Sequence, residues 1–510
     1  MRLRTLVIAA LVASMGAVAY AELQNVEVGG SIRIRGNVFL WDEDSGPGFL
    51  FWQGRSFENR WADMVHGKFG FFDNFDGTRA IGPGNVIQST INRPVWGNFL
   101  GIDNRLNDNS FAEQRTRLNV KADFTDEVSA FIELDSYDNW GEDFRSQNYV
   151  LGIDGRQNGI DDVEMYQAYI EANEMYGVPL RLRVGRQELS FGSEWLVGVN
   201  NTSSFFQGLS FDAVRLTYAT DMFSVDVVAS KVVERMGDFG NNDADFYAVY
   251  ASYLGLEDIT IDAYWMFLRD DVSLIGTDKS DLHTIGLRGA GTLGAFDFEA
   301  EAAYQFGSIE DRGLGWLADF WTPELDWNAL GGNVELGYTF DMSYQPRVYA
   351  GAAYLQGADQ EDNVGIFQIF RGGKTTDLGF NRLFSNWEYS EFLENTELSN
   401  AFVYRLGGSV MPTESVKLTL AGTYIMADEV DSGRFLFWSW EDSDTVGWEL
   451  GLYADYNYTE DLVFRAGYAH FFGDDGLRDG ADILWNGLGE MYTADDADFD
   501  YLFLETEIAF

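Results

Sequence analysis

Arginines spaced two residues apart are the first feature of this sequence that could do chemistry. At this spacing on an extended strand, two side chains point to the same face. A guanidinium group offers planar, paired N–H donors that suit a carboxylate better than an ammonium group does, and only six of the 34 basic residues are lysines. The pattern therefore predicts guanidinium groups on one face of a strand, where they could bind carboxylates. The residues are Arg33, Arg35, Arg115, Arg117, Arg181, Arg183 and Arg215.

Acidic residues occupy the same phase of other predicted strands, so the arginines have an alternative role. They could pair with these carboxylates and with water, whatever the barrel transports. The acids are Glu133, Asp135, Asp226, Asp262, Asp297, Glu299, Glu301, Glu335, Glu449, Glu505 and Glu507. Most cations precede residue 226 and most anions follow it, the exceptions being Arg288, Arg405, Lys417 and Arg465. We therefore expect opposite charge on opposite walls, which would orient a charged or dipolar solute.

Arg186 and Gln187 lie where a predicted strand meets a loop. Gly185 and Gly192 would allow the backbone to turn there. Arg186 joins the seven arginines above as a candidate substrate ligand. The segment could be a constriction that lines the pore, or a structural corner that fixes the loop to the barrel wall.

Strands with period-2 alternation must position these arginines. Val28 and Ile32 share one face near the N-terminus, while Arg33 and Arg35 share the other, and the same alternation recurs over residues 115–124. Apolar residues on one face and polar residues on the other predict an all-β, antiparallel transmembrane barrel, with lipid outside and water within.

The composition favours the same fold class. The 510 residues include 55 glycines, 7 prolines and 16% aromatic residues. Aromatic girdles at two membrane interfaces, glycines where crowded strands bend, and few prolines in hydrogen-bonded ladders produce this balance. No segment beyond the N-terminus approaches the roughly 18 consecutive apolar residues that a transmembrane helix needs. Because the chain has no cysteine, hydrogen bonding and packing must hold the fold.

Short turns and long loops alternate along the chain in an up-and-down topology. The predicted short turns lie at residues 125–127, 173–179, 220–221, 255–258, 291–294, 341–346, 411–415 and 457–461. The segments between them number about 18, an even count that places both termini in the periplasm, with short periplasmic turns and long extracellular loops. Residues 356–399 alternate weakly and are interpreted as a long external or lumen-folding loop, which could hide another hairpin.

The two ends of the chain indicate its destination. Arg2 and Arg4 precede an apolar run and a small-residue cleavage site that ends at Ala21, a pattern typical of a signal peptide. We expect residues 1–21 to be cleaved and residues 22–510 to form one barrel domain. The final strand ends on Phe510 and resembles the signal that the barrel assembly machinery reads. These features predict export to the periplasm and insertion into a Gram-negative outer membrane.

A more specific resemblance begins at residue 165. The chain reads MYQAY from Met165, LRLRVGRQELSFG from Leu180, WLVG from Trp195 and SFDAVRLTY from Ser210. These motifs resemble the alginate export family of outer-membrane barrels, while the downstream half matches only in its general barrel pattern. The resemblance implies a monomeric pore of roughly 18 strands whose lumenal arginines pass an anionic polysaccharide.

Charge limits the expected partners. The net charge of −48 argues against nucleic acid as a partner, because a protein that binds nucleic acid needs a cationic surface. Acidic runs at residues 358–362 and 494–498 lack the spacing of a calcium loop, and no metal or cofactor is predicted. The expected partners are outer-membrane lipid and lipopolysaccharide, the barrel assembly machinery and an anionic polysaccharide.

These patterns leave three functional hypotheses. The first is an outer-membrane channel that passes an anionic polysaccharide such as alginate, or its oligosaccharides. The second is a general or small-solute porin on the same scaffold. The third, a barrel hydrolase, would need His470 on the lipid-facing phase as its base. Because His66, His283 and His470 fit no catalytic or metal-binding pattern, the sequence predicts no enzyme.

Overall fold

The computed structural model describes most of the chain outside its N-terminal region and several connections. The described residues are 23–41, 109–125, 127–140, 163–199, 201, 208–234, 243–270, 279–310, 325–357, 359–360, 375–391, 398–430, 432–435, 438–441, 443–476 and 498–510. The predicted signal peptide, His66 and residues 494–497 lie outside these ranges, so those predictions remain open. Within them, no helix is long and apolar enough to cross a bilayer.

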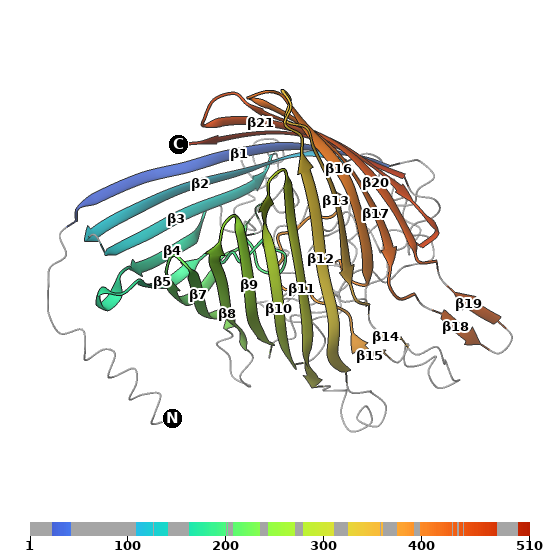
Figure 1. The fold of residues 1–510 in the computed structure, drawn as a ribbon, viewed down its shortest axis with the longest axis horizontal. Coiled ribbons are helices and arrows are strands. Elements are labelled where there is room, and N and C mark those ends of the chain that lie inside the picture. The colour runs from blue at the N-terminus through green and yellow to red at the C-terminus, as the bar shows by residue number, and fades with distance from the viewer. Residues whose placement is uncertain are drawn as a thin grey trace, which may run out of the picture.

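A closed antiparallel barrel forms the body of the molecule (Figure 1). Its sheet has 20 strands, of which the short β14 (Asp359–Gln360) and β15 (Thr375–Leu378) are additions, so 18 make the wall. The wall strands are β1 (Asn25–Trp41), β2 (Asn109–Thr125), β3 (Val128–Asn139), β4 (Glu164–Ala172), β5 (Leu180–Gln187), β6 (Phe211–Ala219), β7 (Phe223–Glu234), β8 (Asp243–Leu256), β9 (Ile259–Asp270), β10 (Lys279–Leu293), β11 (Phe296–Glu310), β12 (Leu325–Thr339), β13 (Arg347–Leu355), β16 (Ala401–Thr413), β17 (Val416–Ala427), β20 (Thr445–Asn457), β21 (Leu462–Gly473) and β22 (Asp498–Ala509). The predicted fold class and strand number are confirmed.

The barrel closes where its first and last strands meet. β1 pairs with β2 on one side and with β22 on the other, so that Arg33 lies opposite both Arg115 and Glu507. Closure leaves no unpaired strand edge within the hydrocarbon, where an exposed N–H or C=O would be costly. A separate hairpin of β18 (Ser432–Phe435) and β19 (Trp438–Glu441) lies beyond the wall (Figure 1).

Alternate residues of each strand face outward and inward, as the sequence predicts. On the outer phase, Val28 is 65% exposed and Leu118 is 44% exposed. Inward residues on the same strands, such as Arg35 and Arg115, are buried. This arrangement is expected when hydrocarbon covers the outside of a barrel and polar groups fill the inside.

Short turns gather at one end of the barrel and long connections at the other. The predicted short turns are confirmed, with the turn after β10 displaced by about two residues because that strand extends to Leu293. One of them contains a 3-10 turn (Met175–Gly177). We call the end with the short turns the turn end, and the end with the long connections the loop end. In barrels of this class the short turns are periplasmic and the long loops extracellular.

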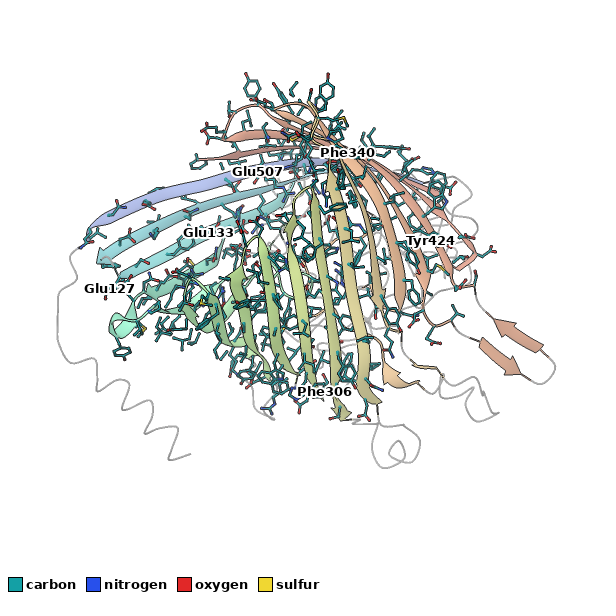
Figure 2. The ribbon with its side chains drawn as sticks, viewed as in Figure 1. Glu127, Glu133, Phe306, Phe340, Tyr424 and Glu507 are labelled. Atoms are coloured by element: carbon teal, nitrogen blue, oxygen red, sulfur yellow. The ribbon has the colours of Figure 1, made fainter. Side chains whose placement is uncertain are left out.

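Aromatic side chains form an outward band near each end. At the turn end Phe340 packs on Tyr338 with 4.8 Å between ring centroids, and at the loop end Trp448 stacks on Phe472 at 3.9 Å. Phe340 and Phe306 lie at opposite ends of the barrel (Figure 2). Two such bands are the girdles that the two interfaces of a bilayer favour.

Candidate functional site: the channel interior

Two connections fold back into the barrel at its loop end and join each other. Residues 188–199 belong to the connection between β5 and β6, and residues 375–391 belong to the connection between β13 and β16. A parallel bridge links Val197 to Phe384, and the Phe384 N–H donates to the Leu196 carbonyl at 2.8 Å. We call the two segments together the plug.

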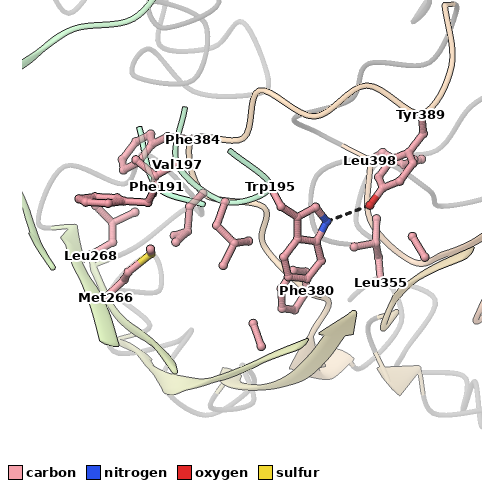
Figure 3. Packing of buried hydrophobic residues seen from close by; sticks show 14 of the residues in the cluster. Phe191, Trp195, Val197, Met266, Leu268, Leu355, Phe380, Phe384, Tyr389 and Leu398 are labelled. Carbon is pink, nitrogen blue, oxygen red and sulfur yellow. Dashed lines mark hydrogen bonds between the residues drawn. The ribbon is translucent and has the colours of Figure 1, made fainter. Parts of the chain in front are cut away.

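The centre of the plug is dry and aromatic (Figure 3). Trp195 stacks on Phe380 with 5.4 Å between centroids, and its indole N–H donates to the Tyr389 hydroxyl at 2.8 Å. Trp195 and Phe380 have no exposed surface. Burying large rings at interior packing density stabilises one arrangement of the two segments.

Inward side chains of the wall hold the plug in place. The Gln305 amide donates to the Asn381 carbonyl at 2.6 Å and accepts from the Asn381 N–H at 2.7 Å. On β20, the Glu449 carboxylate accepts from the Ser390 hydroxyl at 2.6 Å and from the Glu391 N–H at 2.9 Å. Residues 356–399 were interpreted as an external or lumen-folding loop. Residues 380–391 fold into the lumen, while β14 and β15 pair with each other and β15 joins β12 at the edge of the wall. The β14–β15 pairing is the small hairpin within this loop.

The inner wall changes character along the barrel axis. Toward the loop end many of its side chains are apolar, buried and packed in one cluster with the plug: Phe211, Phe246, Leu268, Leu282, Trp327, Leu355, Phe471 and Phe499. Toward the turn end the inward positions are charged: Arg215, Asp226, Asp262, Arg288, Glu299, Glu335, Arg347, Arg465 and Glu507. Water and a charged solute would therefore meet the wall mainly in the turn half.

Three of the predicted arginines lie deep and act as structural anchors. Arg35 is 1% exposed and contacts the Glu505 carboxylate at 2.6 Å. Arg115 contacts Asp135 at 2.6 Å and donates to the Asn201 side chain at 2.9 Å. Arg33 donates to the Asn201 carbonyl at 3.2 Å. Because Asn201 follows the first plug segment, these contacts fasten that segment to the wall.

The other inward arginines of the prediction are half-buried in the turn half. Arg183 contacts Glu171 at 2.6 Å, Arg215 contacts Asp226 at 2.7 Å, and the Arg117 guanidinium lies 3.6 Å from Glu133. Arg181 donates to the Thr217 hydroxyl at 3.3 Å. Arg183 also lies over the Tyr169 ring, 4.2 Å from its centroid. These guanidiniums keep part of their surface open toward the interior.

The structure adds arginines to this set from the later strands. Arg288, Arg405 and Arg465 appear in the sequence analysis only as exceptions to an acidic wall, and Arg347, the first residue of β13, is missed. Their contacts are Arg288 with Asp262 and Glu299, Arg347 with Asp297 and Glu335, Arg405 with Glu335, and Arg465 with Glu505 and Glu507. The period-2 phase of β10, β16 and β21 could have identified the first three.

The expectation of opposite charge on opposite walls is wrong. Early arginines pair with early acids, as Arg183 does with Glu171, and late arginines pair with late acids, as Arg288 does with Asp262. Charge is thus neutralised between neighbouring strands around the barrel, because such contacts cost less than leaving an inward charge unpaired. The segregation that does exist runs along the axis.

Arg186 does not face the interior, and its assignment to the lumen is wrong. It shares the outward phase of β5 with Val184, which is 42% exposed. Its guanidinium makes two hydrogen bonds, of 2.8 and 2.9 Å, to the outward Asp212 of β6. Its neighbour Gln187 is fully buried and donates to the Ala213 carbonyl at 3.0 Å. Both residues therefore tie β5 to β6 just before the connection that follows β5.

The start of the plug carries a partly buried acid. Glu188 follows β5 and accepts a hydrogen bond of 2.8 Å from the Tyr166 hydroxyl. Burial raises the pKa of the Glu188 carboxyl above its ordinary value, since desolvation penalises the charged form. Gly192 has a positive φ of 58°, and an added Cβ there would crowd Arg288 and Tyr250. The predicted need for glycine at this turn is confirmed.

His470 lies on the outer face, as the hydrolase hypothesis requires. Its Nδ1 lies 2.7 Å from the Asp500 carboxylate. Its cross-strand partners are Leu450 and Asp500, so neither is a serine that could act as nucleophile. In the part of the chain that the structure describes, no three His, Cys, Asp or Glu residues form a group that could hold a metal ion.

A closed barrel with an apolar exterior, two aromatic girdles, a paired-charge interior and an inward plug defines the protein as an outer-membrane channel. The chain belongs to the alginate export family, whose model matches residues 97–486, well over half of its length. The search of curated proteins found no match.

Solved structures share the fold at low sequence identity. Pseudomonas aeruginosa OpdL is 10% identical, with a TM-score of 0.51, and the match covers 95% of this chain and 99% of that one. Acinetobacter baumannii OccAB3 is 11% identical, with a TM-score of 0.49 and coverage of 95% and 100%. P. aeruginosa OccK8 (OprE) is 11% identical, with a TM-score of 0.47 and coverage of 95% and 98%. At these identities OpdL supports the barrel fold alone.

Proposed function

We propose that this channel passes an anionic saccharide, alginate or its oligosaccharides, along the arginines of its turn half. The observation that carries the proposal is the distribution of partly accessible guanidiniums around the barrel, from Arg117 on β2 to Arg465 on β21. Family membership supports the same substrate class. A polyuronate carries a carboxylate on each sugar, so successive arginines offer it successive sites.

The carboxylate partners of these arginines make the sites weak. A partly exposed ion pair is worth only about 0–1 kcal/mol, so a substrate carboxylate can replace Glu171 on Arg183 or Asp226 on Arg215 at little cost. Conduction needs sites that release as readily as they bind. Paired arginines therefore suit transport better than unpaired arginines, which would retain a polyanion.

The alternative is a general or small-solute porin on the same scaffold. Pairing between neighbouring strands favours it, because the mixed interior presents carboxylates such as Glu299 and Glu335 as well as guanidiniums. Under this alternative the pairs serve only to keep the interior polar and neutral. We assign no enzymatic activity, since His470 has Asp500 but no serine as a cross-strand partner.

Planar-bilayer recordings test the proposal. Oligouronates added to the chamber should block the wild-type current, and the combined change of Arg117, Arg181, Arg183 and Arg215 to Ala should greatly weaken this block. Thr419→Ala, a neutral inward position on β17, is the matched control and should leave the block unchanged. An equal block in the fourfold variant would favour the general porin.

A reciprocal variant sharpens this test. Glu335 contacts both Arg347 and Arg405, so Glu335→Gln removes a carboxylate partner from two guanidiniums without removing either, while Arg347 keeps its contact with Asp297. Oligouronate block should then become stronger and last longer. A weaker block would contradict the proposal that the arginines are the binding groups.

We further propose that the protein works as a monomer and that its C-terminal strand engages the barrel assembly machinery through Phe510. The Phe510 side chain is 65% exposed, while its backbone pairs with Gly30 of β1. Crosslinking a photoreactive residue at position 510 during assembly would test the contact, and its absence would contradict it.

A further inference from the structure

A row of alternating charges crosses six neighbouring strands on the outer face at the loop end. Each member lies directly opposite the next in the strand register. The members are Arg186, Asp212, Lys231, Asp245, Arg269 and Asp281, on β5 to β10 in order. We call this row the charge ladder.

The ladder points outward. Lys231 shares the phase of Val227 on β7, which is 46% exposed, and Asp281 shares the phase of Ile285 on β10, which is 45% exposed. Each ladder residue also lies within a few positions of a long connection. The row therefore encircles part of the barrel at the end where the long loops leave the wall.

An aromatic row lies beside the ladder on the side of the membrane centre. Tyr247 and Phe267 stack with 6.0 Å between centroids, and His283 lies 4.3 Å from Phe267 and 5.1 Å from Phe306. Aromatic girdles mark the level where hydrocarbon meets headgroups. The ladder, one step farther out, therefore lies at the level of the headgroups of the outer leaflet.

The cations of the ladder remain partly accessible. Arg186 and Lys231 each keep 43% of their side-chain surface exposed. Arg186 is paired with Asp212 at 2.8 Å, and Lys231 contacts Asp245 at 2.9 Å and Asp243 at 3.0 Å. The carboxylates hold the cations at the barrel surface, and such exposed pairs exchange readily.

Two carboxylates lie elsewhere on the described part of the rim. Tyr354 donates to Asp428 at 3.0 Å, and Tyr468 donates to Asp500 at 2.5 Å, both on the outer face. Among the described side chains that point outward, the arginines and lysine all belong to the ladder. The outward cations that an anionic headgroup could contact on the described surface therefore lie in the sector from β5 to β10.

We propose that the charge ladder docks the phosphate groups of a phosphorylated glycolipid of the outer leaflet. Guanidinium groups bind phosphate oxygens through paired, charge-assisted hydrogen bonds, and basic side chains beside a membrane attract anionic headgroups. The adjacent aromatic row would pack on the acyl chains and sugar. The proposal rests on the outer face alone and is independent of the substrate in the lumen.

Native mass spectrometry of the full-length barrel in detergent tests this site. The probes are a bisphosphorylated glucosamine-disaccharide lipid (lipid A), the same lipid without its phosphates, and inorganic phosphate. The wild-type protein should bind the phosphorylated lipid about tenfold or more tightly than the dephosphorylated lipid, a preference of the size that several basic side chains near an anionic surface provide. The combined change of Arg186, Lys231 and Arg269 to Gln should abolish that preference.

The matched control removes the charge of the two carboxylates elsewhere on the rim. Asp428→Asn with Asp500→Asn should keep the preference for the phosphorylated lipid. Heat-dependent electrophoretic migration verifies folding, and if the triple variant does not fold, Arg269→Gln alone should lose part of the preference. The proposal is overturned if the variants lacking cations bind like the wild type, if both lipids bind equally, or if inorganic phosphate displaces the lipid.

Discussion

The two halves of the inner wall use the same alternating strands for different purposes. In the loop half, inward positions such as Phe246 and Leu268 are apolar and pack against the plug. In the turn half, inward positions on the same or neighbouring strands, such as Asp262 and Arg288, are charged and paired. One wall therefore serves as a dry core at one end and as a polar lining at the other.

This difference shows that an inward-facing position is not the same as a channel-lining position. An inward arginine in the loop half, such as Arg115, is enclosed by Asp135 and Asn201 and contributes to structure. An inward arginine in the turn half, such as Arg183, keeps part of its surface open. The predictions below test this distinction, from the largest expected effect to the smallest.

Trp195→Ala should open the plug. Removing this fully buried ring deletes its hydrogen bond to Tyr389 and its stack on Phe380, and a cavity of this kind costs about 3–5 kcal/mol. We expect a severalfold rise in single-channel conductance in planar bilayers and a lower unfolding temperature. Trp448→Ala removes a partly exposed ring on the outer face and should leave conductance unchanged. An unaltered conductance in folded Trp195→Ala would show that the plug does not restrict the path.

Arg35→Gln should destabilise the barrel far more than Arg183→Gln. Arg35 is buried against Glu505. Breaking a buried pair costs up to about 3–5 kcal/mol, although Arg33 and Arg465 would still contact Glu505. The Arg183 pair with Glu171 is partly exposed and should contribute about 0–1 kcal/mol. Urea unfolding of vesicle-inserted protein, followed by tryptophan fluorescence, compares the two. Equal midpoints would remove the basis for separating anchors from lining residues.

Gly331→Ala should displace the plug, although it changes a wall residue and no side chain of the plug. An added Cβ at Gly331 would lie 2.5 Å from the Phe380 ring, whereas one at the neighbouring Gly332 would meet a backbone oxygen at 3.5 Å. Overpacking of this kind costs about 1–3 kcal/mol. We expect a modest change in conductance and unfolding temperature for Gly331→Ala and little change for Gly332→Ala. Similar behaviour of the two variants would contradict close packing of the plug on β12.

Glu188→Gln should raise stability slightly, and only where the carboxyl is ionised. Burial raises the pKa of Glu188 in the folded protein. The wild-type barrel therefore loses stability as the pH rises from the pKa of the unfolded chain to the pKa of the folded protein, and the loss is complete above the folded pKa. Gln keeps an acceptor for the Tyr166 hydroxyl and carries no charge. The unfolding temperatures should agree near pH 4 and favour the variant at pH 8. A variant that is less stable at pH 8 would argue that the charge itself is required.

The inward or outward direction of each strand residue could be predicted from the local sequence, but this rule was not applied to every arginine. The alternation near Arg33 and Arg35 places both inside, and the structure agrees. The same parity, counted from Arg183, places Arg186 outside, where Asp212 pairs with it. Position beside a loop was the wrong criterion for Arg186, because a regular strand keeps its phase up to its last paired residue.

The plug could not be placed from sequence. Residues 375–391 do not alternate, because they belong to no wall strand, and their contacts join distant parts of the chain. Trp195 and Tyr389 are 194 residues apart, and no local pattern relates them. The buried Arg382, which donates to Ser385 and Trp387 within the plug, was missed for the same reason.

By itself the sequence determined the barrel class, the strand number, the turns and the phase of the wall strands, because side-chain alternation and turn chemistry are local properties of the chain. Only the tertiary structure decided which inward positions are dry and which arginines are anchors. The separation of dry positions from lining positions depends on two connections that meet inside a closed barrel. Closure of the barrel brings together residues that are far apart in the sequence, so no local pattern could relate them.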